Sequence, residues 1–245
     1  MAERTTTNAT FPALVLFDLD DTLFDDRFSR VAALRGIRTR EPIFRRVPLP
    51  QLVEEYGRLL DLLHDLTLSG ELSKWDARSL RFERLAMHCG STIEDATARR
   101  LAREYHETYQ LHRRSVPGSP KLLERLRHRA KIGVVTNNLP EEQVEKLEAI
   151  GLRSAVDELV VSGAVGYRKP DPRIFEIALR RTGFDAPSAV MIGDSWENDV
   201  LGARAAGIRP IWLNRFDAPS PEPGRVVELT SYRPLGPVIE RIAGD

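Results

Sequence analysis

The segment Leu14–Leu23 constrains the fold most strongly, because an apolar run leads directly into a cluster of acids. Its first four residues are apolar at consecutive positions, a pattern typical of a parallel strand that is buried on both faces. Asp18, Asp20 and Asp21 follow at once. Unpaired carboxylates at the edge of a core are costly, and they repel one another. Ligands of open parallel sheets bind beyond the carboxyl ends of strands, so we expect Asp18 and Asp20 at a binding site.

Length and composition describe an ordinary globular protein. The chain has 245 residues, 42% hydrophobic and 29% charged, enough for one large domain or one domain with an insertion. Its 36 basic and 36 acidic residues give no net charge, so nothing favours a nucleic acid polymer or a membrane as partner. The single cysteine, Cys89, fits a reducing compartment, and we expect a cytoplasmic protein. Met1–Thr10 is polar and unlike a signal peptide or an anchor.

A long helical segment separates the acidic strand end from the next strand, expected over Lys131–Thr136. The separation is roughly a hundred residues, too many for one crossover connection. Three amphipathic helices are expected there, over Leu49–Leu66, Trp75–His88 and Ile93–His112. We therefore expect residues 25–116 to form a helical cap, inserted into a Rossmann-like catalytic core of residues 1–24 and 117–245.

From Lys131 onward, strand and helix patterns alternate. Further strands are expected over Glu158–Val161, Ala189–Ile192 and Pro210–Leu213. Helices are expected over Pro140–Ile150 and Pro172–Thr182, each followed by a glycine that ends it, and a loop is expected around Gly163–Tyr167. The alternation predicts an α/β fold, a doubly wound parallel sheet with the helical cap inserted.

Polar side chains follow the strands of this predicted sheet. They are Asp18 with Asp20, Thr136, Lys169, and Asp194 with Asp199. Acids and a lysine around one crevice suit phosphate chemistry with Mg²⁺, which prefers hard oxygen ligands. A lysine neutralises phosphoryl charge, a threonine hydroxyl donates to a phosphoryl oxygen, and an aspartate can attack phosphorus. The structural alternatives are turn-forming or helix-capping aspartates, a local hydrogen bond at Thr136 and a solvated Lys169.

Four segments resemble the motifs of the haloacid dehalogenase-like (HAD) superfamily, in order and at suitable spacing. They are Asp18–Leu23, Val134–Asn137, Arg168–Phe175 and Gly193–Asp199. The resemblance spans Pro12 to Leu213, and the cap matches only in placement and helical character. It implies that Asp18 is the nucleophile that forms an aspartyl-phosphate. It also implies that Asp20 protonates the leaving oxygen and then activates water.

The resemblance further implies a set of ligands. The metal ligands for Mg²⁺ are Asp18, the main-chain carbonyl of Asp20, and Asp194. The phosphate-binding residues are Thr136, Asn137 and Lys169. Asp199 would contact a metal-bound water or orient Lys169, or it would cap its own helix instead. Asn138 departs from the glycine that many relatives carry, and asparagine tolerates the left-handed backbone that glycine favours.

The cap placement and Gly193–Asp199 look most like the subgroup of pyrimidine 5′-nucleotidases, phosphoglycolate phosphatases and acylneuraminate-9-phosphatases. We therefore expect a Mg²⁺-dependent phosphatase of a small phosphorylated metabolite, with a nucleoside monophosphate as the first candidate. A sugar phosphomutase of the same superfamily shares the catalytic groups and stays open. Asp20 counts against a 2-haloacid dehalogenase, and the filled catalytic positions count against a binding module. Monomer and homodimer both stay open.

Overall fold

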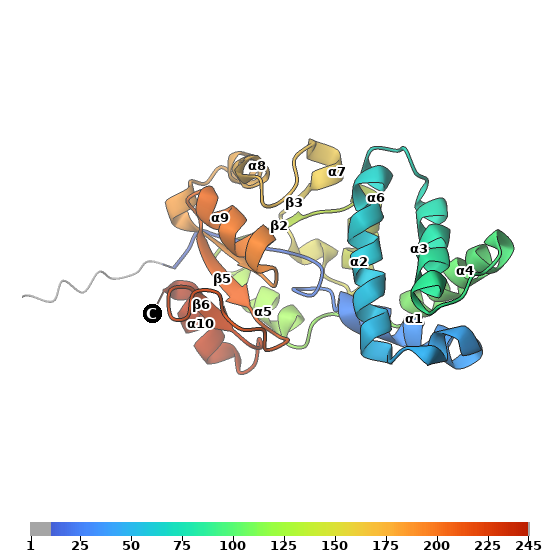
Figure 1. The fold of residues 1–245 in the computed structure, drawn as a ribbon. Coiled ribbons are helices and arrows are strands. Elements are labelled where there is room, and N and C mark those ends of the chain that lie inside the picture. The colour runs from blue at the N-terminus through green and yellow to red at the C-terminus, as the bar shows by residue number, and fades with distance from the viewer. Residues whose placement is uncertain (1–10, 245) are drawn as a thin grey trace, which may run out of the picture. The chain divides into compact units, whose positions relative to one another are not determined.

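The computed structural model describes residues 11–244 and divides into two units (Figure 1). Unit 1 comprises Met1–Phe24 and Ser115–Asp245, and unit 2 comprises Asp25–Arg114. The roles of catalytic core and cap stay predictions for these units. The interpretation of Met1–Thr10 lies outside the described residues.

In unit 1 the described residues form one sheet of six parallel strands, in the order β3-β2-β1-β4-β5-β6. The strands are β1 (Leu14–Phe17), β2 (Lys131–Thr136), β3 (Glu158–Val161), β4 (Ala189–Gly193), β5 (Arg209–Leu213) and β6 (Val227–Leu229). The strand order reverses between β1 and β4, which is the switch point where open sheets bind ligands. The predicted α/β class, a doubly wound parallel sheet, is confirmed.

Helices cover both faces of this sheet. They are α5 (Ser119–Leu126), α6 (Pro140–Ala149), α7 (Ser162–Val165), α8 (Pro172–Thr182), α9 (Gly202–Ala205) and α10 (Leu235–Ala243). Short 3-10 turns occupy Arg153–Ala155 and Ala186–Ser188, and a π-helical turn occupies Trp196–Leu201. In Figure 1, α8 lies on one side of the strands and α10 on the other. The expected loop at Gly163–Tyr167 was wrong in part, since its first three residues belong to the single helical turn of α7, which begins at Ser162.

β1 is buried on both faces, as its continuous apolar run predicts. Leu14 and Leu16 pack with Phe175 of α8 in one cluster, and alternation points Val15 and Phe17 to the opposite face. All four side chains of β1 are fully buried. Gly133 lets β2 approach this strand, because a Cβ there would lie 2.6 Å from Leu16 Cδ2.

Unit 2 is a bundle of four helices among the described residues. They are α1 (Asp26–Arg40), α2 (Leu49–Leu68), α3 (Lys74–His88) and α4 (Asp95–Leu111), with a 3-10 turn at Pro42–Arg46. Tyr56, Phe82 and Tyr105 form the aromatic centre of its core, with ring centroids 4.6 to 5.8 Å apart. The sequence did not mark α1 as a helix, because its apolar stripe is short and lies among arginines.

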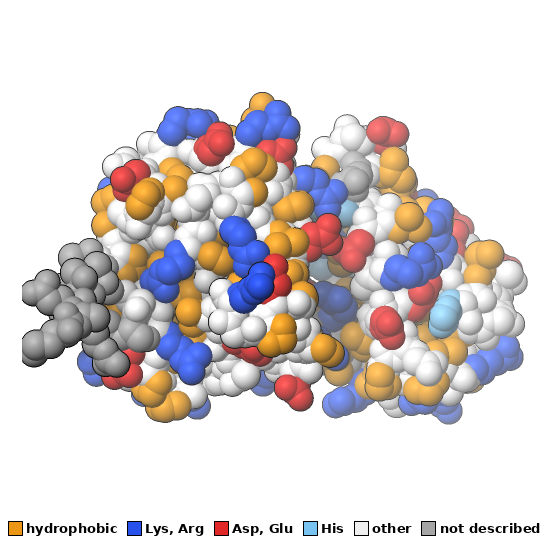
Figure 2. Space-filling model, turned by 60° about the vertical axis from the view of Figure 1, so that its left-hand side comes forward, with side chains coloured by type: hydrophobic (Ala, Val, Ile, Leu, Met, Phe, Trp, Pro, Cys, Tyr) orange, Lys and Arg blue, Asp and Glu red, His pale blue; other side chains and the backbone are white. Residues whose placement is uncertain are grey.

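Lys and Arg side chains are interspersed with Asp and Glu over the face shown in Figure 2. This mixture agrees with the zero formal net charge of the chain. Within residues 11–244, no helix combines the length and the apolarity needed to cross a membrane.

Leu16→Ala tests the packing of the central strand. Because Leu16 is fully buried, we expect the free energy of unfolding to fall by about 2 to 5 kcal/mol. The matched control is Leu201→Ala in the same unit, where the side chain is 39% exposed and the loss should not exceed about 1 kcal/mol. Urea denaturation measures the free energy of unfolding of both variants. Equal losses would contradict the placement of Leu16 in the buried core of the sheet.

Candidate active site

A buried lysine joins two carboxylates at the carboxyl end of the central strands. Lys169, in the loop before α8, is 2% exposed, and its Nζ lies 2.5 Å from Asp18 Oδ1 and 2.6 Å from Asp199 Oδ1. Asp18 directly follows β1, and its main-chain N–H donates to Ile192 O of β4. Lys169 is therefore not a solvated surface charge.

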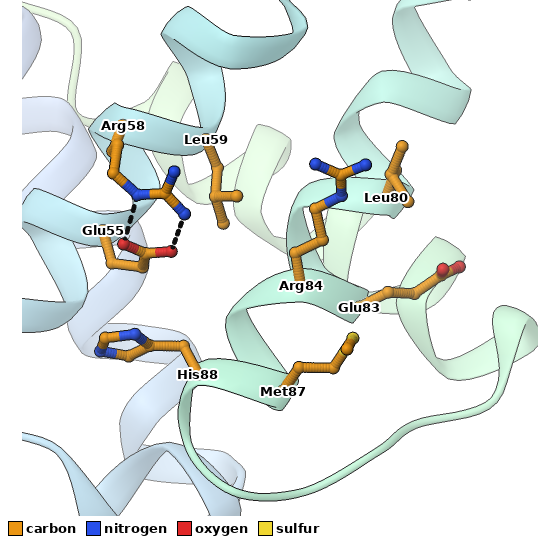
Figure 3. Close-up of a pocket in the computed structure, with 8 residues that line it drawn as sticks. All are labelled: Glu55, Arg58, Leu59, Leu80, Glu83, Arg84, Met87 and His88. Atoms are coloured by element: carbon orange, nitrogen blue, oxygen red, sulfur yellow. Dashed lines mark hydrogen bonds and ion pairs between the residues drawn. The ribbon is translucent and has the colours of Figure 1, made fainter.

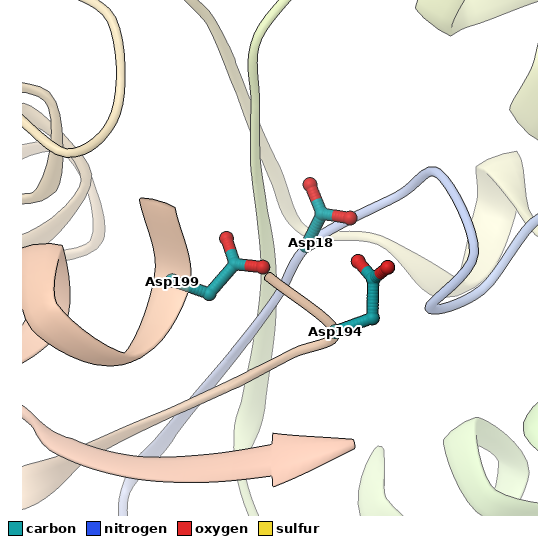
Figure 4. A group of neighbouring side chains, drawn as sticks. All are labelled: Asp18, Asp194 and Asp199. Carbon is teal, nitrogen blue, oxygen red and sulfur yellow. The ribbon is translucent and has the colours of Figure 1, made fainter. Parts of the chain in front are cut away.

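Asp194 brings a third carboxylate to the same place. It follows β4, and its main-chain carbonyl accepts a hydrogen bond from Trp212 Nε1 at 2.8 Å. One carboxylate oxygen each of Asp18, Asp194 and Asp199 lies within 4.8 Å of the others. Figure 4 shows the three side chains grouped together. Three hard oxygen donors at this separation fit Mg²⁺ by their chemistry. Asp18 and Asp194 are the two side chains predicted as metal ligands.

Asp199 is held by the backbone around Gly193. A Cβ at Gly193 would lie 2.2 Å from Asp199 Oδ2, so only glycine leaves room for this carboxylate. The main-chain N–H of Ser195 donates to Asp199 Oδ2 at 3.0 Å. Ser195, and not Asp199, caps the turn Trp196–Leu201, because its side chain accepts from Asn198 N–H.

Burial and crowding shift the titration of these groups. Desolvation by burial raises the pKa of Asp18 to about 6; Lys169 opposes this rise, and the Asp199 carboxylate adds to it. Burial, followed by the charges of Asp18 and Asp199, also raises the pKa of Asp194 well above its ordinary value. Burial alone would lower the pKa of Lys169, but Asp18 and Asp199 outweigh it and raise that pKa. The cluster therefore combines three carboxylates, of which two have a raised pKa, with the single ammonium of Lys169.

Asp20 belongs to a second polar network. Its Oδ1 lies 2.6 Å from Lys146 Nζ, and its Oδ2 accepts from Gln143 Nε2 at 3.2 Å. The same amide nitrogen donates to Thr136 Oγ1 at 2.8 Å, so Thr136 is linked to Asp20. Gln143 and Lys146 were missed in the sequence. The available signal was their position, since they share the buried face of α6 with Leu147.

Asn137 holds the loop that carries Lys169. Its Nδ2 donates to Lys169 O at 3.0 Å, and its Oδ1 accepts from Lys169 N–H at 2.8 Å. This paired contact ties the end of β2 to the lysine. The phosphate contact expected of Asn137 stays a prediction.

A pocket lies elsewhere, within unit 2, between α2 and α3 (Figure 3). It is lined by Glu55, Arg58, Leu59, Leu80, Glu83, Arg84, Met87 and His88. Arg58 and Glu55, both on α2, form an ion pair at 2.6 Å in the lining of this pocket. The predicted site residues take no part in its lining.

Comparison with known proteins assigns the chain to a family. Residues 12–207 match the model of the haloacid dehalogenase-like hydrolases. A phosphoserine phosphatase of Thermus thermophilus is 33% identical over 222 residues, which cover 82% of this chain and 88% of that protein. The pyrimidine 5′-nucleotidase YjjG of Escherichia coli is 42% identical over 108 residues, covering 44% of this chain and 48% of that protein.

Solved structures share the fold. A magnesium-bound HAD-hydrolase YfnB of Bacillus subtilis has a TM-score of 0.73 at 23% identity, covering 94% of this chain and 100% of that chain. Dehalogenases occur among the structural neighbours as well. The same fold therefore occurs in phosphatases and in dehalogenases, and the two reactions have to be distinguished by the residues of the site.

Mg²⁺ binding should depend on pH. Mg²⁺ requires ionised carboxylates, and Asp18, with its pKa raised to about 6, is largely protonated below that pH in the metal-free chain. We expect the Kd for Mg²⁺ to rise roughly tenfold or more on going from about pH 8 to about pH 5. Isothermal titration calorimetry at constant ionic strength measures this, and a Kd that does not change with pH would contradict it.

Proposed function

The chain belongs to the haloacid dehalogenase-like hydrolases, and on this premise we propose a Mg²⁺-dependent phosphatase of small phosphorylated metabolites that works through an aspartyl-phosphate on Asp18. One observation carries the proposal. Asp18, at the end of the central strand, has one oxygen fixed by the buried Lys169, and Asp194 lies beside it. The phosphatase names of the relatives support the same reaction class.

In the first step Asp18 attacks phosphorus. Lys169 holds Asp18 Oδ1, which leaves Oδ2 as the nucleophile. The bond from Asp18 to phosphorus forms as the bond from phosphorus to the ester oxygen breaks. The ammonium of Lys169 and the hydroxyl of Thr136 stabilise the charge on the phosphoryl oxygens.

Asp20 handles the protons in both steps. In its protonated form Asp20 gives a proton to the leaving ester oxygen, so that the product departs as an alcohol. The carboxylate that remains is the form paired with Lys146 in this structure. The resulting carboxylate then takes a proton from the water that attacks the phosphorus. The bond between phosphorus and Asp18 breaks, inorganic phosphate leaves, and Asp18 is restored. The side chain of Asp20 is 30% exposed, which gives water access to it.

Asp18, Asp194 and the main-chain carbonyl of Asp20 would hold the Mg²⁺. The bound ion would neutralise phosphoryl charge in the site. The magnesium in the structure of YfnB supports this assignment. Asp199 and Asn137 position Lys169 through its ammonium and its main chain.

We place the reaction in unit 1 as the catalytic core, with unit 2 as the cap. The relatives named for phosphoserine and for pyrimidine nucleotides differ in substrate, and a nucleoside monophosphate is the first candidate for this chain. The single cysteine supports action in the cytoplasm. A panel of nucleotides, sugar phosphates, phosphoserine and phosphoglycolate identifies the substrate by release of inorganic phosphate. A phosphomutase would instead return the phosphate to a sugar.

Asp18→Asn and Asp20→Asn test the two carboxylates with p-nitrophenyl phosphate. We expect Asp18→Asn to lower kcat by about a thousandfold or more, because the nucleophile is lost. Asp20→Asn should lower it by about a hundredfold or more, through loss of the acid and base. EDTA should abolish turnover of the wild type.

The matched control is Asp21→Asn in the same turn. Asp21 has a φ of +59°, which asparagine also adopts, and its carbonyl accepts from Arg215 at 3.0 Å. We expect this variant to keep most of the turnover. Full activity in Asp18→Asn, or turnover that survives EDTA, would refute the proposed mechanism.

A further inference from the structure

We propose that Gln143 and Lys146 of α6 are positioning residues that hold Asp20 and Thr136 for proton transfer and phosphoryl binding. This inference rests on the proposed function. Neither residue lies in the four motif segments, and neither would touch the reacting phosphorus. Both act through the residues that do.

Lys146 fixes one oxygen of Asp20. It is 9% exposed, and its Nζ lies 2.6 Å from Asp20 Oδ1 and 5.2 Å from the ring centroid of Phe24. A desolvated ammonium over an aromatic face gains a cation–π attraction, which restricts where it can sit. Phe24 is itself tied to the turn after Asp18, because its main-chain N–H donates to Leu19 O at 2.8 Å. Lys146 and Asp20 are thus both held against the turn that follows Asp18.

Gln143 fixes the other oxygen and reaches Thr136. It is fully buried, and its Nε2 donates to Asp20 Oδ2 and to Thr136 Oγ1. Both oxygens of Asp20 then have a partner on α6, so rotation of the carboxylate would break a contact. A hydroxyl carries one hydrogen, and since Thr136 Oγ1 accepts from Gln143, that hydrogen is left to donate to a phosphoryl oxygen.

The orientation of the Gln143 amide is unfavourable for the stability of the fold. Its Oε1 is buried and has no hydrogen-bond partner among the described residues. Such an unpaired buried oxygen destabilises a fold, because it loses its hydrogen bonds to water without a replacement. Turning the amide over would place Oε1 against the Asp20 carboxylate and cost more. A buried amide kept at this expense, with both donor contacts on site residues, indicates a role in the reaction.

The test compares leaving groups. Alkoxides leave only with a proton from Asp20, whereas 2,4-dinitrophenolate leaves without one. We expect Lys146→Met to lower kcat/KM by about a hundredfold for an alkyl phosphate such as glycerol 3-phosphate. For 2,4-dinitrophenyl phosphate the loss should stay below about threefold. Gln143→Leu should also lower kcat/KM much more for the alkyl phosphate than for the dinitrophenyl phosphate. It should in addition raise KM for both substrates, because Thr136 loses its partner, so its loss for the dinitrophenyl phosphate exceeds that of Lys146→Met.

Two variants serve as controls. Lys146→Arg keeps a cation and should recover most of the alkyl phosphate activity. Glu148→Gln lies on the exposed face of the same helix and should change neither substrate. Thermal melting confirms that each variant is folded.

The outcomes separate this inference from the proposed function. If Lys146→Met lowers kcat/KM equally for both substrates, or for neither, while Asp18→Asn stays inactive, the positioning role is wrong and the proposed function stands. If Asp18→Asn is active, or the wild type cleaves neither substrate, the proposed function fails and the inference falls with it.

Discussion

The ion pairs of one buried lysine are the interaction on which the rest of the site depends. Lys169 Nζ lies between Asp18 and Asp199 with almost no access to water, so its ammonium replaces part of the hydration that each carboxylate loses. One cation cannot balance three acids. Burial, with the charges of the neighbouring carboxylates added to it, raises the pKa values of Asp18 and Asp194. The cluster is therefore short of positive charge. A phosphatase site that binds Mg²⁺ requires such a deficit of positive charge, because the bound ion completes the charge balance.

The sheet brings this cluster together at its switch point. β1 and β4 end side by side, so Asp18 and Asp194 follow neighbouring strands. Gly193 leaves the space that the Asp199 carboxylate occupies, and Asn137 ties the end of β2 to the loop of Lys169. The helix after β2 supplies the contacts to Asp20. Residues from segments more than a hundred positions apart thus meet within unit 1.

Much of the fold could be predicted from the sequence. The strands β1 to β5 and the fold class followed from apolar runs and glycine stops, whereas β6 was not predicted as a strand. Membership of the superfamily and the phosphatase class followed from four ordered motifs. Gln143 and Lys146 were not found, because a polar residue on an amphipathic helix gives no sign of its partner until tertiary contacts form. The same limit applied to Asn137, whose amide faces a main chain thirty-two residues away. Helix α1 was missed because packing, not local pattern, stabilises it.

The most direct measurement is the site of phosphorylation during turnover. Wild-type protein is quenched in acid while it hydrolyses a good substrate, then digested and mapped by mass spectrometry. The account predicts a base-labile phosphoryl group on the peptide that contains Asp18, and its absence from Asp18→Asn. A phosphoryl group on any other residue, or steady hydrolysis with no phosphorylated peptide in a sample trapped before turnover is complete, would contradict the central role of Asp18.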